Sequence, residues 1–504
     1  MTRFGDHAFL SLIDRKIRTR LKKTIWNPII PLFLLLLTVY VFSAGGHLYS
    51  IDDVGTYSTT EAIVKTGSIN IAYAIPLYHK LGFLQDLPDN ASSYYSGTGL
   101  MQSVLAIPFY FVGSWLGVEQ WKIVDLLYSP MLSAISGCFV YAIARRLRMS
   151  RKLSATIAIL YGFATIAWPY AKFFFDVTTA STMQLAAVYF VLDPNEHRKS
   201  IFLSGLFVGF SVFARIAQVI VLPAMIGYVA FKHRVSIRRA IIRVGIFMIP
   251  LVLGTLLYEF LNIVKFGQPV TLASINASIM FHPALSNPLI GVYGMLLSSG
   301  EGLFIYYPLC AIGLFALLAY GKNQRSERFL FGWFFFINLL FYGRLVFWHG
   351  WVAWGARYLV PSVPYLILAS APFLQSMKTS IVRAAVGVYA ISFGVFSNLM
   401  GVLINFNYAT GYLAMIGAFN LSNGAPDMAY EPGIWVPGFS PLRASWDLIW
   451  SQEYPAEWYS RVPEIFYLKD RFDLFLYNTF GAPILLATLA LVFLEAVWLV
   501  RTLK

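Results

Sequence analysis

The sequence has few charged residues and almost no cysteine. Only 12% of its 504 residues are Asp, Glu, Lys or Arg, whereas 58% are hydrophobic and 17% are aromatic. So little charge cannot cover a soluble fold of this length, which excludes a water-soluble globular protein. The two cysteines, Cys138 and Cys310, are too few for a disulfide framework, and no thiolate metal site is supported. We find no internal repeat and no low-complexity linker.

Long apolar segments dominate what remains. A bilayer core of about 30 Å needs about 20 apolar residues per helix. Runs such as 31–42 and 485–500 lack the alternation of barrel strands, so helices are the expected spanning elements. The sequence therefore predicts an all-α polytopic membrane protein. The expected helices are 28–48, 124–144, 153–172, 177–193, 201–213, 215–231, 240–262, 303–320, 329–346, 358–376, 382–405 and 481–500.

The positions of the basic residues predict the topology. Most of the 38 Lys and Arg residues fall in clusters at 3–23, 145–152, 198–199, 232–243, 322–328, 378–383 and 501–504. If every cluster is cytoplasmic, the chain makes twelve crossings with both termini inside, and most acids face outward. The net charge of +14 is then an orientation signal, and we expect no nucleic-acid partner. One alternative stays open, because 201–231 can be read as one long tilted helix interrupted by Arg215.

Four regions follow from this topology. Residues 1–27 form a basic cytoplasmic tail whose interspersed apolar residues suit a helix on the inner membrane surface, with a solvated tail as the alternative. The core is 28–405, including a first outer loop at 49–123. A late outer loop follows at 406–480, and 481–504 is the last helix with a short tail. We find no cleavable signal peptide and expect the first helix to be a signal anchor.

The outer face carries long segments rich in aromatic residues. These are 49–123, 263–302 and 406–480. Within the first, Leu100 to Leu116 is short and contains Pro108, so we expect a helix lying in the interface rather than across the membrane. Such segments can enclose a cavity open to both water and lipid, where an enzyme would meet a lipid-linked substrate.

The most informative feature is an acidic pair, Asp52 and Asp53, directly after the first apolar run. Adjacent carboxylates are rarely kept where a helix leaves the bilayer unless a substrate meets them there. A structural reading also exists, since one of the two can cap the following helix through backbone N–H groups.

Short outer-face segments carry a resemblance to a known superfamily. The first-loop segment IDDVGTY at 51–57, with Glu61 and KTG at 65–67, resembles the signature of GT-C glycosyltransferases that use polyprenyl-phosphate sugars, such as protein O-mannosyltransferases and the lipid A aminoarabinose transferase. Over about the first 380 residues, further segments recur in the same order: PFY at 108–110, FD at 175–176, FGQP at 266–269, GLFIYYP at 302–308 and WGARYLVP at 354–361.

The resemblance implies roles for the acidic pair and its neighbour. Transfer from a polyprenyl phosphate needs a general base for the acceptor hydroxyl, which a carboxylate can supply. Asp52 holds the place of the family's catalytic Asp, and Asp53 stands where Glu is usual, with a shorter reach. Tyr57 holds the place of the Tyr that follows and is a candidate substrate-binding residue.

The lipid phosphate that leaves needs a cation. Arg donates two parallel hydrogen bonds to a phosphate, so Arg357 is the best candidate and Arg215 the second. Arg357 can instead snorkel to headgroups or stack on Trp, and Arg215 can instead pair with Asp176. Lys172 and Arg344 are weaker candidates for the same task.

Four further residues are candidate substrate-binding groups: Asp176, Glu301, His349 and Tyr358. Asp176 can also serve the N-terminus of the following helix, and Glu301 departs from the basic residue common in relatives. No two outer-face histidines share a metal-ligand spacing, so we expect no metal site. No cofactor is firmly implied, and a requirement for a divalent cation stays undecided.

The sequence thus predicts a GT-C-type hexosyl- or pentosyltransferase in a prokaryotic plasma membrane. It would move one sugar, with inversion, from a polyprenyl-phosphate donor to a lipid, glycan or protein acceptor on the extracytoplasmic face. Two alternatives stay open. One is a polysaccharide ligase or polymerase that uses lipid-diphosphate donors. The other is a twelve-helix transporter, although the halves show no duplication and intramembrane acids are few.

Overall fold

A computed structural model describes residues 27–80, 84, 86–231, 236–267, 287–318, 325–350, 353–420, 430–451 and 472–504. Over these ranges the regular structure is helical, with no strand, which confirms the all-α prediction. The predicted amphipathic tail at 1–27 lies outside the described residues except for its last position.

Each of the twelve predicted apolar segments coincides with helical structure. In chain order the helices are α2 (Ile29–Phe42), α6 (Gln120–Arg146), α7 (Arg151–Phe163), α8 (Asp176–Val191), α9 (Arg198–Ala214), η3 with α10 (Ile216–Val221, Leu222–Phe231), α11 (Ile237–Phe266), α14 with α15 (Leu303–Tyr306, Pro308–Leu318), α16 (Arg325–Gly343), η7 with α17, α18 and η8 (Arg357–Ser362, Val363–Ala369, Ala371–Ser376, Met377–Thr379), α19 (Ile381–Leu403) and α26 (Ala482–Thr502).

Local chemistry explains where some of these helices stop. Helix α9 ends at Ala214 because Arg215 has an extended backbone, with φ −149° and ψ 106°, so the single long helix considered for 201–231 is wrong. Helix α7 ends at Phe163, well before the predicted boundary, and the chain reaches α8 through a short 3₁₀ turn, η2, that starts at Pro169. Proline at the first helical position suits such a start because its missing N–H would be unpaired there.

The protein is an integral membrane protein by the character of its helices. Among the residues that the structure describes, five helical stretches, including α6, α11, α19 and α26, are long and apolar enough to cross a bilayer. The other predicted spans coincide with shorter apolar helices or with helices interrupted by 3₁₀ turns, so the prediction of twelve crossings stays a prediction.

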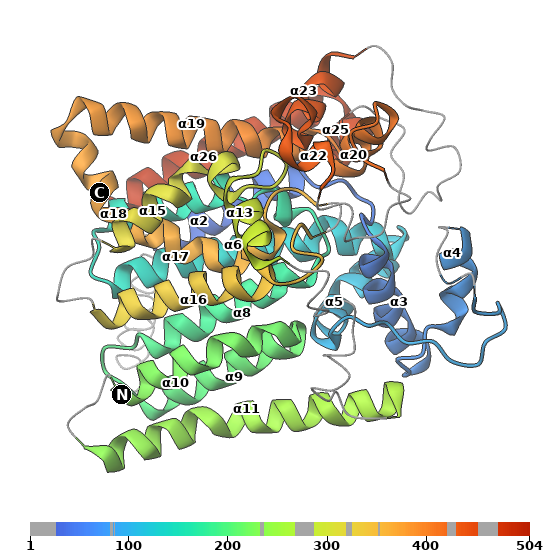
Figure 1. The fold of residues 1–504 in the computed structure, drawn as a ribbon, viewed down its shortest axis with the longest axis horizontal. Coiled ribbons are helices and arrows are strands. Elements are labelled where there is room, and N and C mark those ends of the chain that lie inside the picture. The colour runs from blue at the N-terminus through green and yellow to red at the C-terminus, as the bar shows by residue number, and fades with distance from the viewer. Residues whose placement is uncertain are drawn as a thin grey trace, which may run out of the picture.

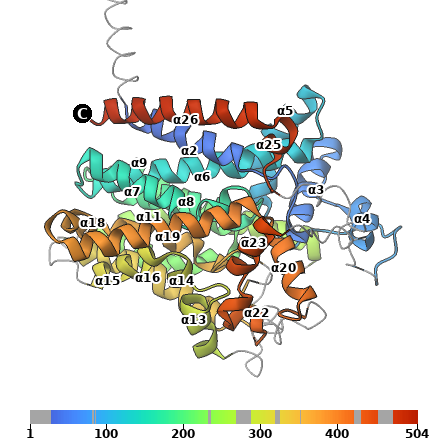
Figure 2. The ribbon, with the colours of Figure 1, turned by 90° about the horizontal axis from the view of Figure 1, so that it is seen from above.

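The long helices lie side by side, and the short elements gather at one end. Helix α8 packs on α9, α9 on α11, and α2 packs between α6 and α26. Figures 1 and 2 show α3, α4, α20, α22, α23 and α25 beyond one end of this bundle, with the C-terminal end of α26 at the opposite end. The two ends of the bundle therefore differ, and the assignment of the end with the short elements to the outer face stays a prediction.

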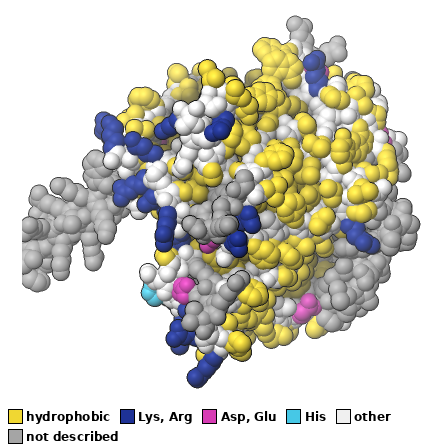
Figure 3. Space-filling model, turned by 60° about the vertical axis from the view of Figure 1, so that its left-hand side comes forward, with side chains coloured by type: hydrophobic (Ala, Val, Ile, Leu, Met, Phe, Trp, Pro, Cys, Tyr) yellow, Lys and Arg dark blue, Asp and Glu magenta, His cyan; other side chains and the backbone are white. Residues whose placement is uncertain are grey.

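The flanks of the bundle present side chains suited to lipid. Large hydrophobic side chains are exposed along α11, including Leu253, Leu256 and Phe260, and along α26, including Leu486 and Phe493. In Figure 3 a broad hydrophobic surface covers much of the visible face, and most of the visible Lys and Arg side chains lie toward its left side. A wide apolar surface bordered by basic residues is typical of a membrane-embedded bundle.

The remaining elements, called the outer elements below, are short. They are α3 (Ile51–Thr66), η1 (Ala72–Ala74), α4 (Ile75–Lys80), α5 (Leu100–Leu116), α13 (Pro288–Leu297), α20 (Phe406–Met415), α22 (Pro432–Trp435), η9 (Pro437–Phe439), α23 (Pro441–Trp450) and α25 (Phe475–Phe480). Helices α3, α4 and α5 share a small core with α6, whereas buried residues of α13, α20, α22 and α23 belong to the main core. Helix α5 coincides with the predicted interfacial helix and exposes Phe111 and Trp115, as such a helix should.

Candidate active site

The acidic pair lies at the start of α3, where the two carboxyl groups have different surroundings. Ser50 caps the helix, and Asp53 completes a capping box: its Oδ2 accepts from the backbone N–H groups of Ser50 at 3.1 Å and Tyr49 at 3.0 Å. Asp53 is fully buried, whereas the Asp52 side chain is 55% exposed. Two neighbouring residues on a helix point in different directions, so the structure leaves only Asp52 open to a substrate.

Burial dominates the electrostatics of Asp53. It raises the pKa of this carboxyl from 3.8 to about 7, against the lowering effect of the Tyr49 N–H bond. The charge of Asp52 raises the pKa further, and Arg357 and Ser50 lower it. Oδ1 of Asp53 has no hydrogen-bond partner within the described part of the chain. Asp53 therefore caps helix α3. That it also takes part directly in catalysis stays a prediction.

Arg357 lies beside Asp52. Its Nη2 is 3.6 Å from Asp52 Oδ2, and its guanidinium lies over the Phe175 ring at 4.1 Å from the centroid. The side chain is 12% exposed, and Nε has no hydrogen-bond partner among the described residues. This arginine thus has donor capacity left over, held next to an exposed carboxylate.

The turn before η7 sets the position of Arg357. Gly350 and Gly355 have φ of +69° and +63°, a conformation that glycine adopts without strain. A Cβ atom on Gly350 would lie 3.2 Å from Cβ of Arg357, so the close approach also favours glycine. Residues 351–352 of this turn, and with them Trp351, lie outside the described residues.

Arg215 and Asp176 form a second ion pair nearby. Nη1 of Arg215 lies 2.7 Å from Oδ1 of Asp176, and its Nε donates to the Tyr342 hydroxyl at 2.9 Å. The rings of Tyr342 and Tyr358 stack at 4.4 Å and lie beside the guanidinium. Arg215 thus adopts the pairing with Asp176 that the sequence offered as an alternative to binding phosphate.

The two arginines meet adjacent residues at the start of α8. Arg357 covers Phe175, and Arg215 binds Asp176, the first residue of the helix. The structure therefore brings Asp52, Arg357, Asp176 and Arg215 to one place, together with Tyr358, from the separate elements α3, η7, α8 and the end of α9.

Glu301 and His349 are buried near the same arginine. Glu301 is 3% exposed, and burial raises its pKa well above the usual range, while the charge of Arg357 lowers it. Its Oε2 has no hydrogen-bond partner in the described structure. His349 is 1% exposed and packs edge-on against Trp348. Neither side chain is open to a substrate in this structure, so both stay candidates only.

Tyr57 lies apart from this cluster, in the small core that α3, α4 and α5 share with α6. It is 5% exposed and stacks on Tyr110 with ring centroids 6.3 Å apart. Burial raises the pKa of its phenol. These contacts give Tyr57 a packing role, and its predicted contact with substrate stays a prediction.

Sequence reasoning missed two phenols near the acidic pair. Tyr78 and Tyr94 pack edge to face at 5.4 Å, and the charge of Asp52 is among the causes that, after burial, raise the pKa of both. Phenols that keep their protons beside a carboxylate are suitable donors to sugar hydroxyls. The aromatic richness of 49–123 was the only signal for them.

A second group, of which the sequence singled out only Lys172, lies behind the loop before α3. Asp473 binds His47, Tyr49 and Lys172, and all four are buried. Lys172 donates to Val402 O at 2.7 Å, to Asp473 O at 2.9 Å and to Asp473 Oδ2 at 2.8 Å. An ammonium has three protons, so Lys172 has none left for a phosphate, and Arg344 is exposed elsewhere.

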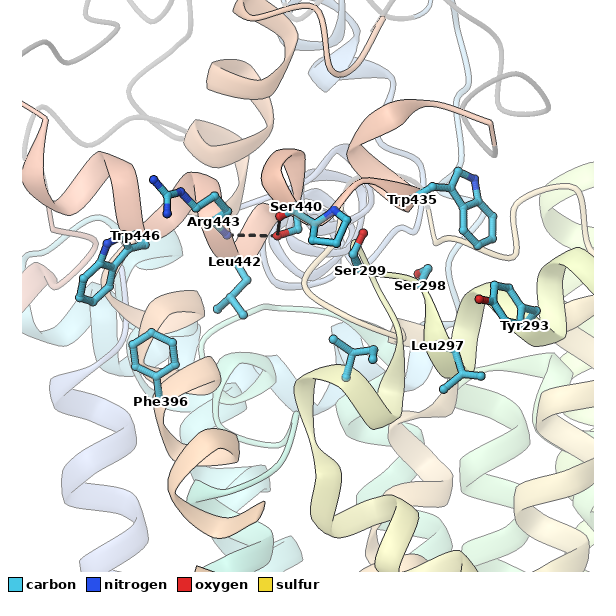
Figure 4. A pocket seen from close by; sticks show the side chains of 12 residues that line it. Tyr293, Leu297, Ser298, Ser299, Phe396, Trp435, Ser440, Leu442, Arg443 and Trp446 are labelled. Atoms are coloured by element: carbon cyan, nitrogen blue, oxygen red, sulfur yellow. Dashed lines mark hydrogen bonds between the residues drawn. The ribbon is translucent and has the colours of Figure 1, made fainter. Parts of the chain in front are cut away.

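A cavity of about 540 Å³ opens among the outer elements. Figure 4 shows its lining, to which α13, α19, η9 and α23 contribute: Tyr293, Leu297, Ser298, Ser299, Ile305, Phe396, Trp435, Pro437, Ser440, Leu442, Arg443 and Trp446. Trp435 stacks on Tyr293 and contacts Trp348, the neighbour of His349. A second cavity of about 370 Å³ shares Tyr293 and Trp435. The late outer loop thus contributes aromatic walls to this cavity, and Trp435 links it to the segment that carries His349.

Among the described residues no three His, Cys, Asp or Glu side chains are grouped to hold a metal ion. The predicted outer-face His282 lies outside the described residues. Whether the reaction uses a divalent cation is therefore a question for experiment.

Comparison with known proteins gives likeness at the level of fold. No protein-family model matches the chain, and no curated protein matches it. ArnT from Cupriavidus metallidurans, solved in the apo state and bound to undecaprenyl phosphate, is similar over 83% of this chain and 76% of its own, with 13% identity and a TM-score of 0.44. The oligosaccharyltransferase AglB from Archaeoglobus fulgidus, solved with an inhibitory peptide and a dolichol-phosphate, is similar over 80% of this chain and 58% of its own, with 11% identity and a TM-score of 0.45. At these identities and TM-scores the two neighbours say nothing about the chemistry of the site, which has to be derived from this chain's own residues.

Proposed function

We propose that the protein is a membrane glycosyltransferase that transfers one sugar from a polyprenyl-phosphate donor to an acceptor hydroxyl on the extracytoplasmic face. Asp52 is the general base, and Arg357 binds the phosphate that leaves. The observation that carries the proposal is the half-exposed carboxylate of Asp52 beside the largely buried guanidinium of Arg357, with 3.6 Å between Oδ2 and Nη2.

This pair is suited to a displacement at a phosphorylated sugar. An exposed carboxylate can take a proton from an attacking hydroxyl, and a guanidinium with unused donors can bind a phosphate through two parallel bonds. The distance of 3.6 Å between Nη2 and Oδ2 is longer than a good charge-assisted hydrogen bond, so both groups keep hydrogen-bonding capacity for a substrate.

The reaction needs one base and one anion site. The acceptor oxygen attacks the anomeric carbon while Asp52 takes its proton. The bond from that carbon to the phosphate oxygen breaks, and the polyprenyl phosphate leaves with the electron pair, held by Arg357. A single direct displacement inverts the anomeric centre, and no second carboxylate is needed as a nucleophile.

The neighbouring residues support this pair. Asp176 and Arg215 form an ion pair that fixes the start of α8, over which Arg357 lies. In the proposal, Asp176 and Arg215 also contact the sugar or the phosphate of the bound donor. Tyr358 stacks on Tyr342, and the Arg215 guanidinium lies over its ring at 5.2 Å from the centroid.

We assign the cavity of Figure 4 to the acceptor. Its walls combine aromatic rings with the hydroxyls of Ser298, Ser299 and Ser440, a mixture suited to a sugar or to the junction of a sugar and a lipid. Arg443 lies at its edge, with its Nε 2.9 Å from Oδ2 of Asp447. The identity of the sugar and that of the acceptor are left to experiment.

The test is an incubation of the purified protein with polyprenyl-phosphate hexoses and pentoses and a lipid extract of its host membrane, followed by mass spectrometry. We expect one donor to be consumed with release of polyprenyl monophosphate, and Asp52→Asn to stop this. Asp89→Asn is the matched control, because Asp89 is an exposed aspartate of the same outer loop.

Other outcomes are informative. Consumption of a lipid diphosphate in place of the monophosphates would make the protein a ligase or polymerase. Normal turnover by Asp52→Asn would remove the proposed base. If no lipid-linked sugar is consumed, the transferase proposal is wrong and a transporter becomes the leading alternative.

A further inference from the structure

A closed network of buried groups lies behind the loop that leads into α3, whose first turn carries Asp52. At its centre Asp473, from the segment before α25, is 1% exposed. Its Oδ1 lies 2.8 Å from Nε2 of His47, and its Oδ2 accepts from the Tyr49 hydroxyl at 2.9 Å and from Nζ of Lys172 at 2.8 Å. The charges of Lys172 and His47 overcome burial and hold the pKa of Asp473 below its usual range.

The network joins parts of the chain that are far apart in sequence. Lys172 precedes α8, and its Nζ also donates to the carbonyl of Val402 near the end of α19. The backbone N–H of Asp473 donates to Leu403 O, and that of Phe475 donates to Ala44 O. The segment that leads into α25 and α26 is therefore fastened to both α19 and the loop after α2.

One residue connects this network to the catalytic pair. The hydroxyl of Tyr49 donates to Asp473, its backbone N–H donates to Asp53 Oδ2, and its carbonyl accepts from Nδ2 of Asn407. Asp53 is the capping residue of α3, and Asp52 precedes it directly. A displacement of Tyr49 would therefore move the first turn of α3 and with it the carboxylate of Asp52.

The loop also fits too closely to shift on its own. A Cβ atom on Gly45 would meet the Tyr49 hydroxyl and would lie 2.6 Å from Asp473 Oδ1. Gly46 has φ +69°, and a Cβ there would lie 2.7 Å from the Phe475 ring. Glycine at both positions lets the C-terminal segment contact the backbone of the loop.

Buried ion pairs are a weak source of net stability, because desolvation offsets most of the attraction. A fully satisfied network is more useful for fixing one geometry. We propose that Asp473 and Tyr49 are positioning residues for Asp52, so that the C-terminal segment 473–475 is part of the catalytic centre. This inference rests on the proposed function for the role of Asp52.

The first experiment needs no substrate. Hydrogen exchange by mass spectrometry is measured in detergent for wild type, Tyr49→Phe and Tyr40→Phe. Tyr40 is the matched control: it is also a fully buried tyrosine whose hydroxyl makes one hydrogen bond, to Gly162 O at 3.0 Å, but within the bundle. We expect Tyr49→Phe to speed exchange in peptides covering 49–56 by about tenfold while α26 is unchanged. Tyr40→Phe should leave 49–56 unchanged.

The second experiment measures two quantities. One is turnover with the donor that the incubation under "Proposed function" shows to be consumed, and the other is affinity for undecaprenyl monophosphate. We expect Tyr49→Phe to lower kcat by about tenfold or more, with affinity within about twofold of wild type, because a small misplacement of the base affects the chemical step. The double variant Lys172→Met/Asp473→Leu, which replaces the pair by apolar groups, should fold and show the same loss. Tyr40→Phe should keep wild-type kcat.

Several results would overturn the inference. If exchange at 49–56 is unchanged in Tyr49→Phe, the network does not hold the loop. If exchange rises but kcat stays normal, the loop does not position the base. If the double variant folds and has the kcat of wild type, the network has only a structural role. Failure of wild type to consume any donor would instead remove the proposed function, and the exchange data would still report separately on the loop.

Discussion

Two ion-paired clusters lie on either side of the first turn of α3, and they differ in almost every respect. In the outer cluster Asp52 and Arg357 are 3.6 Å apart, with side chains 55% and 12% exposed. In the inner cluster Asp473 and Lys172 are 2.8 Å apart and both are 1% exposed. The outer pair has unused donors and acceptors, whereas all three protons of Lys172 are bonded.

The difference separates a reacting site from its support. A group that must exchange partners with a substrate needs access and spare hydrogen-bonding capacity. A group that fixes geometry needs neither, and burying it unpaired would be costly. The outer cluster should therefore respond to mutation in rate and binding with little change in stability. The inner cluster should respond in stability and loop order, and in rate only through the position of Asp52.

The largest effect should come from the base. Asp52→Asn keeps the shape of the side chain but cannot accept the hydroxyl proton, so we expect turnover to fall by about 10²- to 10⁴-fold. Thermal stability and affinity for undecaprenyl monophosphate should stay near wild type, because Asp52 is half exposed and loosely paired. Assays of turnover, thermal unfolding and lipid binding on the same preparation check this. A large loss of stability would show that Asp52 supports the fold and is not the base.

Removing one member of the inner pair should lower stability, which Asp52→Asn should not. Lys172→Met leaves Asp473 buried without its main cation, so we expect about 3–5 kcal/mol of destabilisation, seen as a lower unfolding temperature. Lys65→Met is the matched control, since Lys65 is 60% exposed and paired with Glu61; it should change stability by less than about 1 kcal/mol. Equal effects of the two substitutions would erase the distinction between the clusters.

The phosphate site should show a smaller change, confined to binding. Arg357→Ala removes charge-assisted bonds worth about 1.5–3 kcal/mol, so affinity for undecaprenyl monophosphate should fall by about tenfold or more. Arg243→Ala, which breaks an ion pair with Glu196 elsewhere in the fold, should bind the lipid normally. Unchanged affinity in Arg357→Ala would assign this arginine a role in packing on Phe175.

The smallest effect concerns the pH dependence of Asp53. Its folded-state pKa is raised from 3.8 to about 7, so its contribution to stability is full below about pH 4 and is lost as pH rises to about 7. Asn can still accept the capping bonds, so Asp53→Asn should gain stability relative to wild type between pH 4 and 8. A parallel pH dependence of the two proteins would contradict the buried, protonated state.

The helices were predictable because their signal is local. Each apolar segment coincides with helical structure, and Arg215 marks a real break between α9 and η3. The approach of Arg357 to Asp52 was not visible in the sequence, since it depends on packing between residues about 300 apart. What the motif pattern supplied was the identity of the two residues, not their geometry.

The inner cluster could not be predicted for a physical reason. A lysine before α8 and an aspartate near the end of the late loop carry no periodic or motif signal, and their pairing exists only after the helices have packed. Conversely, Tyr57 belongs to the motif but lies in a packed core, because the residues of α3 from Asp53 to Thr60 are buried on all sides of the helix.

The most direct test of the central claim is a mass spectrum of the lipids that co-purify with wild type and with Arg357→Ala. The account predicts a polyprenyl monophosphate, or its monosaccharide adduct, bound to wild type and depleted in the variant. A lipid diphosphate bound equally to both proteins, or no polyprenyl lipid in either, would contradict it.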